Sequence, residues 1–269
     1  MVERMSSTPV YLGEKPDGVS PSRVSQFKNC PRQYQYVSVE RLPEKKGEAA
    51  YRGTIFHAVL ENLFRDEAPE DRTVDNAMKH FRSLYREYMT PEAIEELGFD
   101  EIRVQKYAAE ITKLIRTYFT MEDPSSIDVV STEIRLDLDM GDFGLRGIID
   151  RLDRLPDGTL AIRDYKTGKV PKPRYESKAL EACQVYAYLC EKVYGERPSV
   201  MSLIYVKDAV TIEKTVTDID IRDAETRVRS VWAAIERAYE TSNFPAQPSI
   251  LCNWCSFQQR CQEDNYSVF

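Results

Sequence analysis

Two aspartates and a lysine, Asp150, Asp164 and Lys166, are the residues whose types and spacing are best suited to chemistry. Two carboxylates that lie close together repel each other unless a cation sits between them. Their hard oxygen atoms favour Mg²⁺ or Mn²⁺ as that cation. The three side chains therefore indicate a divalent-metal site. The alternative is an exposed hairpin with an ordinary ion pair.

The element that must position these side chains is the segment 147–166, which reads GIIDRLDRLPDGTLAIRDYK. It is typical of a β-hairpin, because two runs rich in Ile and Leu flank the strong turn dipeptide Asp157-Gly158. Folding about that turn brings Asp150 roughly opposite Asp164. Side chains alternate along a strand. One face therefore carries Ile148, Asp150 and Leu152 on the first strand and Leu160, Ile162, Asp164 and Lys166 on the second. We expect this face to be apolar until it ends in the two carboxylates and the ammonium.

Asp150 followed by the sequence DYKTG at 164–168 resembles the nuclease core of the PD-(D/E)XK superfamily, in its RecB-like branch. The resemblance implies that Asp150 and Asp164 hold the metal and that the backbone carbonyl of Tyr165 adds a ligand. It also implies that Lys166 assists the attacking water. The second acid is Asp where many members of the superfamily carry Glu, and this fits the RecB-like branch.

His57 is the third candidate metal ligand. It lies at the edge of an apolar helical stripe formed by Phe56, Val59, Leu60 and Leu63. GTIFHAVLE resembles the RecB-like helix whose His completes the metal shell, and a neutral imidazole suits a site with two carboxylates. The alternative is a hydrogen-bonded core His. His80 has no such context, and we interpret it as a surface or packing residue. Glu133 is either a water-mediated metal contact or an exposed strand residue.

A second metal-type pattern lies in the tail, where Cys252, Cys255 and Cys261 follow the spacing Cys-x₂-Cys-x₅-Cys. Three thiolates need a fourth partner. In the RecB-like nucleases that own an iron–sulfur cluster, the fourth is a Cys before Pro-Arg near the N-terminus, and SPSRVSQFKNCPRQYQY places Cys30 there. Four thiolates suit zinc or a [4Fe–4S] cluster. The resemblance favours the cluster.

A predicted helix over 178–194 carries Gln184 and Tyr188, four residues apart and therefore on one face. QVYAY resembles the family's Gln-x-x-x-Tyr motif, which helps to hold the DNA strand. Cys183 and Cys190 on the same helix have apolar neighbours, and we interpret them as buried thiols. The preceding loop, 169–178, forms a local basic patch that is suited to phosphate or is simply solvated. Its basic residues are Lys169, Lys172, Arg174 and Lys178.

The composition narrows the class of protein. The 269 residues are 42% hydrophobic and 30% charged, with a net charge of −7, enough for one sizeable core. The negative charge argues against avid nonspecific nucleic-acid binding but leaves room for a local basic groove. We find no transmembrane run and no signal peptide, and therefore expect a cytoplasmic protein. In that compartment the six cysteines are not expected to form a disulfide framework.

The resemblance covers Ser20 to Cys261 and implies an α/β fold, a restriction-endonuclease-like core with a central mixed sheet flanked by helices. A helical insertion and an iron–sulfur clamp joining the N- and C-terminal segments complete it. We expect a flexible leader over 1–19 and a single nuclease domain over 20–269. Its predicted parts are a largely helical region at 52–125, a catalytic sheet core at 127–216 and a cluster-binding tail at 245–269.

The function implied is that of a metal-dependent DNA exonuclease in repair, recombination or phage- or CRISPR-related DNA processing. The implied partners are DNA, single-stranded or with a free end, and a helicase or CRISPR integrase. The chain has no GxxxxGK[ST] loop and thus no helicase motor of that type. Two alternatives come from other classes: a catalytically inactive DNA-end-binding adaptor, and a zinc-stabilised interaction protein.

Overall fold

The computed structural model describes residues 14–264, and they fall into two compact units. Unit 2 comprises residues 46–138 and 147–224. Unit 1 gathers residues 14–45, 139–146 and 225–264, which are far apart in the sequence. Within the described residues, no helix is long and apolar enough to cross a membrane.

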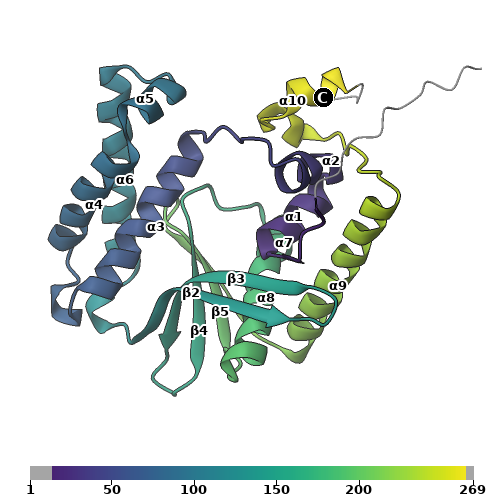
Figure 1. Ribbon diagram of the computed structural model, residues 1–269. Coiled ribbons are helices and arrows are strands. Elements are labelled where there is room, and N and C mark those ends of the chain that lie inside the picture. Colours follow the sequence, from purple (N-terminus) through teal and green to yellow (C-terminus); the bar gives the residue numbers. More distant parts are fainter. Residues whose placement is uncertain (1–13, 265–269) are drawn as a thin grey trace, which may run out of the picture. The chain divides into compact units, whose positions relative to one another are not determined.

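A mixed β-sheet forms the centre of unit 2 (Figure 1). Its strands are β2 (Val129–Asp139), β3 (Gly144–Arg154), β4 (Leu160–Lys166), β5 (Val200–Tyr205) and β6 (Val210–Thr215). The order is β3-β4-β5-β6, and β2 pairs with β3. β4 and β5 run parallel, whereas β3–β4 and β5–β6 are antiparallel. The predicted α/β class with a mixed central sheet is confirmed.

A helical layer packs on one face of this sheet. It contains α3 (Glu48–Asp66), α4 (Val74–Tyr88), α5 (Pro91–Leu97) and α6 (Glu101–Met121). Its core joins Phe56 and Ile111 of the helices to Tyr165 and Ile204 of the strands. The helix ends follow local chemistry, because Thr90 caps α5 at one end and Gly98 ends it with φ +66°.

A second helical segment packs against β4 and β5. It is divided into α7 (Glu176–Ala179), α8 (Glu181–Leu189) and a π-helical turn (Cys190–Tyr194). Cys183 of α8 lies near Asp164, whereas Tyr165 belongs to the core under α3 and α6. Because neighbouring strand residues point to opposite faces, α8 and the α3–α6 layer cover opposite faces of β4.

A buried arginine ties the hairpin to the helical layer. Arg151 of β3 is completely buried and donates to Tyr118 Oη at 2.8 Å and to both oxygens of Glu122 at 3.0 Å. It also donates to Asp153 at 2.7 Å. Burying an unpaired guanidinium would be very costly. This network therefore fixes how β3 is oriented beneath α6.

Unit 1 contains β1 (Gly18–Val19), α1 (Pro21–Asn29), α2 (Pro31–Tyr34), a π-helical turn (Gln35–Val39), a 3₁₀ helix (Ile250–Trp254) and α10 (Gln258–Glu263). α9 (Asp218–Glu240) begins in unit 2 and continues into unit 1. Ser20 caps α1 and Pro21 opens it, as predicted. Residues 1–13 of the expected leader lie outside the described residues, while Gly18 and Val19 pair with the start of β3. A Cβ on Gly18 would lie 2.1 Å from the carbonyl oxygen of Gly144, so this close approach requires glycine.

Candidate active site

The hairpin of β3 and β4 has the predicted turn and register. Its ladder pairs Leu152 with Ile162 and Arg154 with Leu160. One further step of that register sets Asp150 opposite Asp164. Gly158 supplies the turn with φ +84°, a conformation that glycine adopts at little cost.

The predicted apolar face of β3 is wrong at one residue. Ile148 is 50% exposed, whereas Ile149 and Leu152 are fully buried. Strict alternation is therefore interrupted between Ile149 and Leu152. The interruption coincides with Asp150, whose Oδ2 accepts the backbone N–H of Tyr165 at 2.7 Å. A side chain here takes an N–H of the neighbouring strand, which changes the local phase.

His57 of α3 reaches this end of the hairpin with both ring nitrogens. Nδ1 lies 3.4 Å from Asp150 Oδ1, and Nε2 lies 3.1 Å from the backbone oxygen of Tyr165. Burial acts to lower the pKa of His57, but the hydrogen bond and negative charge of Asp150 outweigh it and raise the pKa. The structure thus brings three predicted metal-binding groups together.

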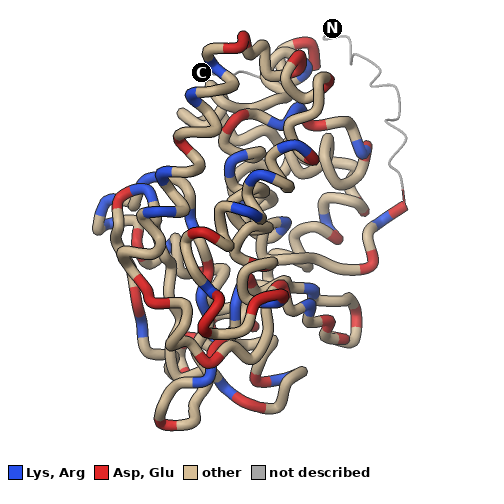
Figure 2. The backbone as a smooth tube through the Cα atoms, turned by 90° about the vertical axis from the view of Figure 1, so that its left-hand side faces the viewer, with Lys and Arg blue, Asp and Glu red and all other residues tan. Residues whose placement is uncertain are grey.

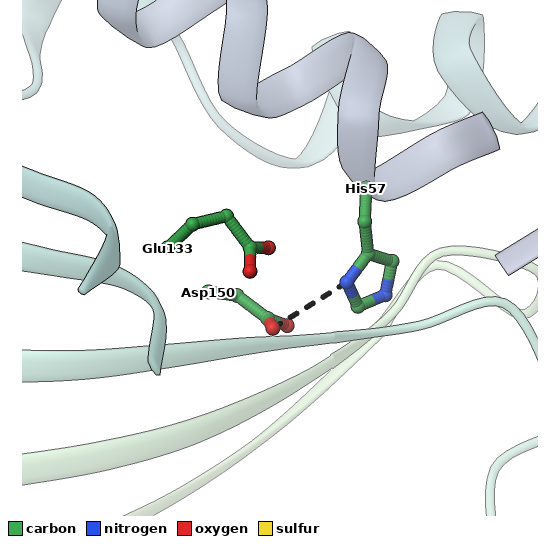
Figure 3. A group of neighbouring side chains, drawn as sticks. All are labelled: His57, Glu133 and Asp150. Carbon is green, nitrogen blue, oxygen red and sulfur yellow. Dashed lines mark ion pairs between the residues drawn. The ribbon is translucent and has the colours of Figure 1, made fainter. Parts of the chain in front are cut away.

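Glu133 joins the same group from β2. One ligand atom each from His57, Glu133 and Asp150 lies within 4.8 Å of the others, and the side chains converge in Figure 3. Glu133 has φ +46°, a strained conformation for a residue with a side chain. Burial and the charge of Asp150 raise its pKa to about 7. Of the two readings of Glu133, the structure therefore favours a place at the site.

Asp164 and Lys166 lie next to this group on β4. Asp164 is 4% exposed, and burial raises its pKa although the adjoining Lys166 partly offsets that effect. The Lys166 ammonium pairs with Asp164 Oδ2, yet without hydrogen-bond geometry, so this buried oxygen has no hydrogen-bond donor. Burial would lower the pKa of Lys166, but Asp164 raises it. The lysine therefore stays charged.

These donors fit a divalent cation. The buried Asp164 oxygen that lacks a donor is a vacant acceptor of the kind that a cation satisfies. Glu133 and Asp150 repel each other as neighbouring acids, and a positive ion between them would remove that repulsion. Oxygen donors with one imidazole suit Mg²⁺ or Mn²⁺.

α8 presents a different face to the acids from the one expected. Cys183 and Tyr186 are the residues whose pKa values are raised by burial and then by the charges of Asp164 and Asp150. Gln184 is 8% exposed and donates to Asp220 Oδ1 at 2.7 Å. Tyr188 is 3% exposed. Little of either side chain is therefore open to a DNA strand. The helical spacing defined this face of α8 but not the direction in which it points.

The remaining polar candidates have simple surroundings. His80 pairs with Glu67 at 3.0 Å, away from the acids. The four basic residues of the loop 169–178 are exposed. Arg174 lies over the ring of Tyr175.

Four cysteines meet in unit 1, independently of the acids. Cys30, Cys252, Cys255 and Cys261 all line one small cavity of about 30 Å³. Burial raises the pKa of Cys255 and of Cys261, and the neighbouring cysteines raise it further. The predicted ligand set therefore comes together although its members are far apart in the sequence. Cys183 and Cys190, by contrast, are buried in unit 2, as expected of packed thiols.

A family model described as the PD-(D/E)XK nuclease superfamily matches residues 18–262. Among curated proteins, one of the two subunits of an ATP-dependent helicase/deoxyribonuclease from Streptococcus mutans is 29% identical over 167 residues, which is 58% of this chain and 14% of that protein. The equivalent protein of Streptococcus pyogenes is 30% identical over 143 residues, or 50% of this chain and 13% of that protein. The chain therefore matches only about a seventh of these relatives' length.

A solved structure supports the fold. A protein of Eubacterium rectale that carries a provisional exonuclease assignment superimposes with a TM-score of 0.53. The superposition covers 94% of this chain and 90% of that protein, at 14% sequence identity. At this identity the similarity concerns the fold alone.

Proposed function

The chain belongs to the PD-(D/E)XK nuclease superfamily, and we propose that it is a DNA exonuclease that depends on Mg²⁺ or Mn²⁺. The observation that carries the proposal is the convergence of His57, Glu133 and Asp150 beside the Asp164–Lys166 pair. A cation site next to a buried lysine on one strand is what phosphodiester hydrolysis requires.

The proposed ligands are Asp150, Asp164, His57 and the backbone carbonyl of Tyr165, and Glu133 is a further acid at the site. When bound, the metal would polarise the scissile phosphate and lower the pKa of a water molecule. The chain's own groups are held in place for that task. The N–H of Tyr165 orients Asp150, and His57 is fixed between Asp150 and the Tyr165 carbonyl.

Lys166 is the proposed catalytic cation. Because its pKa is raised, its ammonium keeps three donor hydrogens at neutral pH. It would orient the attacking water or balance the negative charge that develops on the phosphate. Deep burial in a water-poor site strengthens that electrostatic effect.

The proposed role of α8 changes with its orientation. Gln184 and Tyr188 were expected to hold the strand directly, but both are buried. We propose that Gln184 instead fixes α8 through its bond to Asp220. Cys183 and Tyr186 would then be the α8 residues closest to the acids.

Two further parts of the proposal concern a cluster and a partner. The four cysteines that line one cavity support a [4Fe–4S] cluster in unit 1, with zinc as the chemical alternative. The curated relatives are named as helicase/deoxyribonuclease subunits. Since this chain lacks a GxxxxGK[ST] loop, we propose that a separate helicase delivers DNA with a free single-stranded end.

A cleavage assay tests the proposal. End-labelled single- and double-stranded DNA is incubated with the protein in Mn²⁺, in Mg²⁺ and in EDTA, with circular single-stranded DNA as the substrate without ends. We expect metal-dependent loss of the linear DNA only. Asp164→Asn and Asp150→Asn should each lower the rate by about 10²-fold or more, as loss of a group that stabilises charge does.

The two histidines of the chain provide a matched control. His57→Ala should reduce cleavage, whereas His80→Ala should not. Cleavage that persists in EDTA, or in Asp164→Asn, would refute the active-site assignment. A protein that binds DNA ends but cuts nothing would be the inactive adaptor.

A further inference from the structure

A second cavity in unit 2 lies where the parallel strands β4 and β5 end. It has a volume of about 270 Å³ and is lined by Thr167 and Lys207, among others. Thr167 directly follows Lys166, and Lys207 follows β5 by two residues. The N–H of Val206 donates to the Lys166 carbonyl at 3.1 Å, which holds the two strand ends together. The carboxyl ends of parallel strands are a preferred place for ligands in α/β sheets.

The cavity carries positive charge that the protein does not neutralise. Arg52, Lys113 and Lys207 line it, and within residues 14–264 neither lysine forms an ion pair. Arg52 Nε is buried without a hydrogen-bond partner, and its guanidinium lies 3.9 Å from Glu110.

The acids of the cavity, by contrast, are already engaged. Glu110 accepts from Arg103 at 2.6 Å, and Asp208 accepts the N–H of Val170 at 2.7 Å. Donors in excess over free acceptors, in a chain with a net charge of −7, indicate a site for an anion. Basic and acidic residues are otherwise interspersed along the chain (Figure 2).

The cavity is close to the proposed cleavage site. Thr167 is one residue from Lys166, which is about 3.8 Å along the chain. Arg52 precedes His57 on α3 by 57 − 52 = 5 residues, or about 7.5 Å at a rise of about 1.5 Å per residue. That is about two steps along a nucleic-acid strand, at about 3.4 Å per step. At about 30 Å³ per water, the volume equals that of about nine waters, more than one phosphate needs.

We propose that this cavity binds a nucleotide of the substrate strand next to the scissile phosphate, with its phosphate held by Arg52, Lys113 and Lys207. The inference rests on the proposed nuclease function and extends it. It explains how an acidic protein can hold a polyanion: a few uncompensated cations lie beside the catalytic strand rather than across a whole face.

Metal-free binding tests this inference without cleavage. A labelled single-stranded oligonucleotide is titrated in EDTA at several salt concentrations, with the parent and the variants Lys113→Gln, Lys207→Gln and their combination. Each lysine that contacts a phosphate contributes about 0.7 to the slope of log K against log salt for single strands. We therefore expect the slope to fall by about that amount for each substitution.

Two matched variants control for charge and for folding. Lys106→Gln removes the same charge from α6 outside the cavity, and its slope should stay at the parent value. Lys113→Arg keeps the charge in the cavity and should restore the slope. Both lysines are exposed, so the melting temperatures should not change. A double variant with the slope and affinity of the parent would overturn the inference.

Cleavage kinetics separate this inference from the nuclease proposal. In Mn²⁺ the double variant should show a raised KM with little change in kcat, because the lysines hold the strand and not the reacting atoms. A parent that cuts nothing yet binds with a lysine-dependent slope would refute the nuclease and support the nucleotide site. A parent that cuts with the same KM as the double variant would refute the site.

Discussion

At the scale of single residues, the site is a set of charged groups that oppose one another when no cation is present. Glu133 and Asp150 are close enough to share an ion with His57. Asp164 is buried with an oxygen that no hydrogen bond satisfies. Glu133 also has an unfavourable backbone conformation. Such features lower stability and persist where function requires them.

Glu133→Gln tests whether this acid is a ligand. The variant removes a buried acid next to Asp150, so in EDTA its melting temperature should rise above that of the parent. Saturating Mn²⁺ should stabilise the parent more than the variant, because a ligand that binds the folded state stabilises it in proportion to its affinity. Thermal unfolding of both proteins in EDTA and in Mn²⁺ measures both effects. Equal stabilisation by Mn²⁺ would exclude Glu133 from the metal shell.

Lys166→Met separates the proposed catalytic cation from the metal ligands. Cleavage should fall by about 10²-fold or more, while Mn²⁺ affinity should stay near the parent value, since an ammonium binds no metal. Calorimetric titration with Mn²⁺ measures the affinity. A variant unable to bind Mn²⁺ would mean that Lys166 organises the site through Asp164 and is not catalytic.

At the scale of elements, the start of α9 fixes the position of α8. Thr217 Oγ1 accepts the N–H of Asp220 at 3.3 Å, and Asp220 Oδ2 accepts the N–H of Thr217 at 2.9 Å. This reciprocal pair is a capping box. The other oxygen of Asp220 accepts from Gln184 and pairs with Lys214. One buried carboxylate thus holds a helix end, a strand and the helix beside the acids.

The stability contributed by Asp220 should depend on pH. Burial raises its pKa, but hydrogen bonds from Lys214 and Thr217 outweigh burial and lower it from 3.8 to about 2. A pKa lowered by folding stabilises the protein above the unfolded value and loses that effect as pH falls through the folded value. Nearly two pKa units correspond to about 2 kcal/mol.

Asp220→Asn should therefore be less stable than the parent at pH 6, and the difference should shrink between pH 4 and pH 2. Urea unfolding at several pH values measures the difference. Asp218→Asn is the matched control one position from the capping box, because its side chain is 78% exposed and an exposed pair adds little. A gap for Asp220→Asn that does not change with pH would contradict the assigned pKa.

At the scale of the whole molecule, unit 1 is assembled from three separate stretches of the chain. Cys30 and Cys252 line its small cavity although they are 252 − 30 = 222 residues apart. Closing so long a loop removes roughly 5 kcal/mol of unfolded-chain entropy if the disulfide model is borrowed. That is similar to the net stability of a whole domain. A metal group here would therefore act mainly as a structural clamp.

Substitution of the cysteines tests the proposed clamp. The protein purified without oxygen should be brown, with iron and sulfide near four each per chain, as a [4Fe–4S] site implies. Replacing any of Cys30, Cys252, Cys255 or Cys261 by Ser should remove the colour and lower the melting temperature sharply. Cys183→Ser and Cys190→Ser should keep the colour. A colourless protein with one zinc would replace the cluster and leave the nuclease proposal unchanged. Colour lost in Cys183→Ser but kept in Cys30→Ser would refute the ligand assignment.

The sequence by itself determined the features that depend on neighbouring residues. Asp157-Gly158 and the flanking apolar runs fixed the hairpin and its register, because turn geometry and alternation are local properties. The caps Ser20 and Thr90 and the left-handed Gly98 marked helix ends for the same reason. The mixed sheet and the family followed from motifs carried on these elements.

Only the tertiary structure decided which faces meet. Arg151 would be placed on the surface by its charge, but partners on α6 and β3 make it fully buried. Gln184 shares the predicted face of α8, yet Asp220, 36 residues away, holds that face away from solvent. Glu133 reaches the acids because its backbone takes φ +46°. Periodicity defines a face but not what covers it, since the covering groups come from distant parts of the chain.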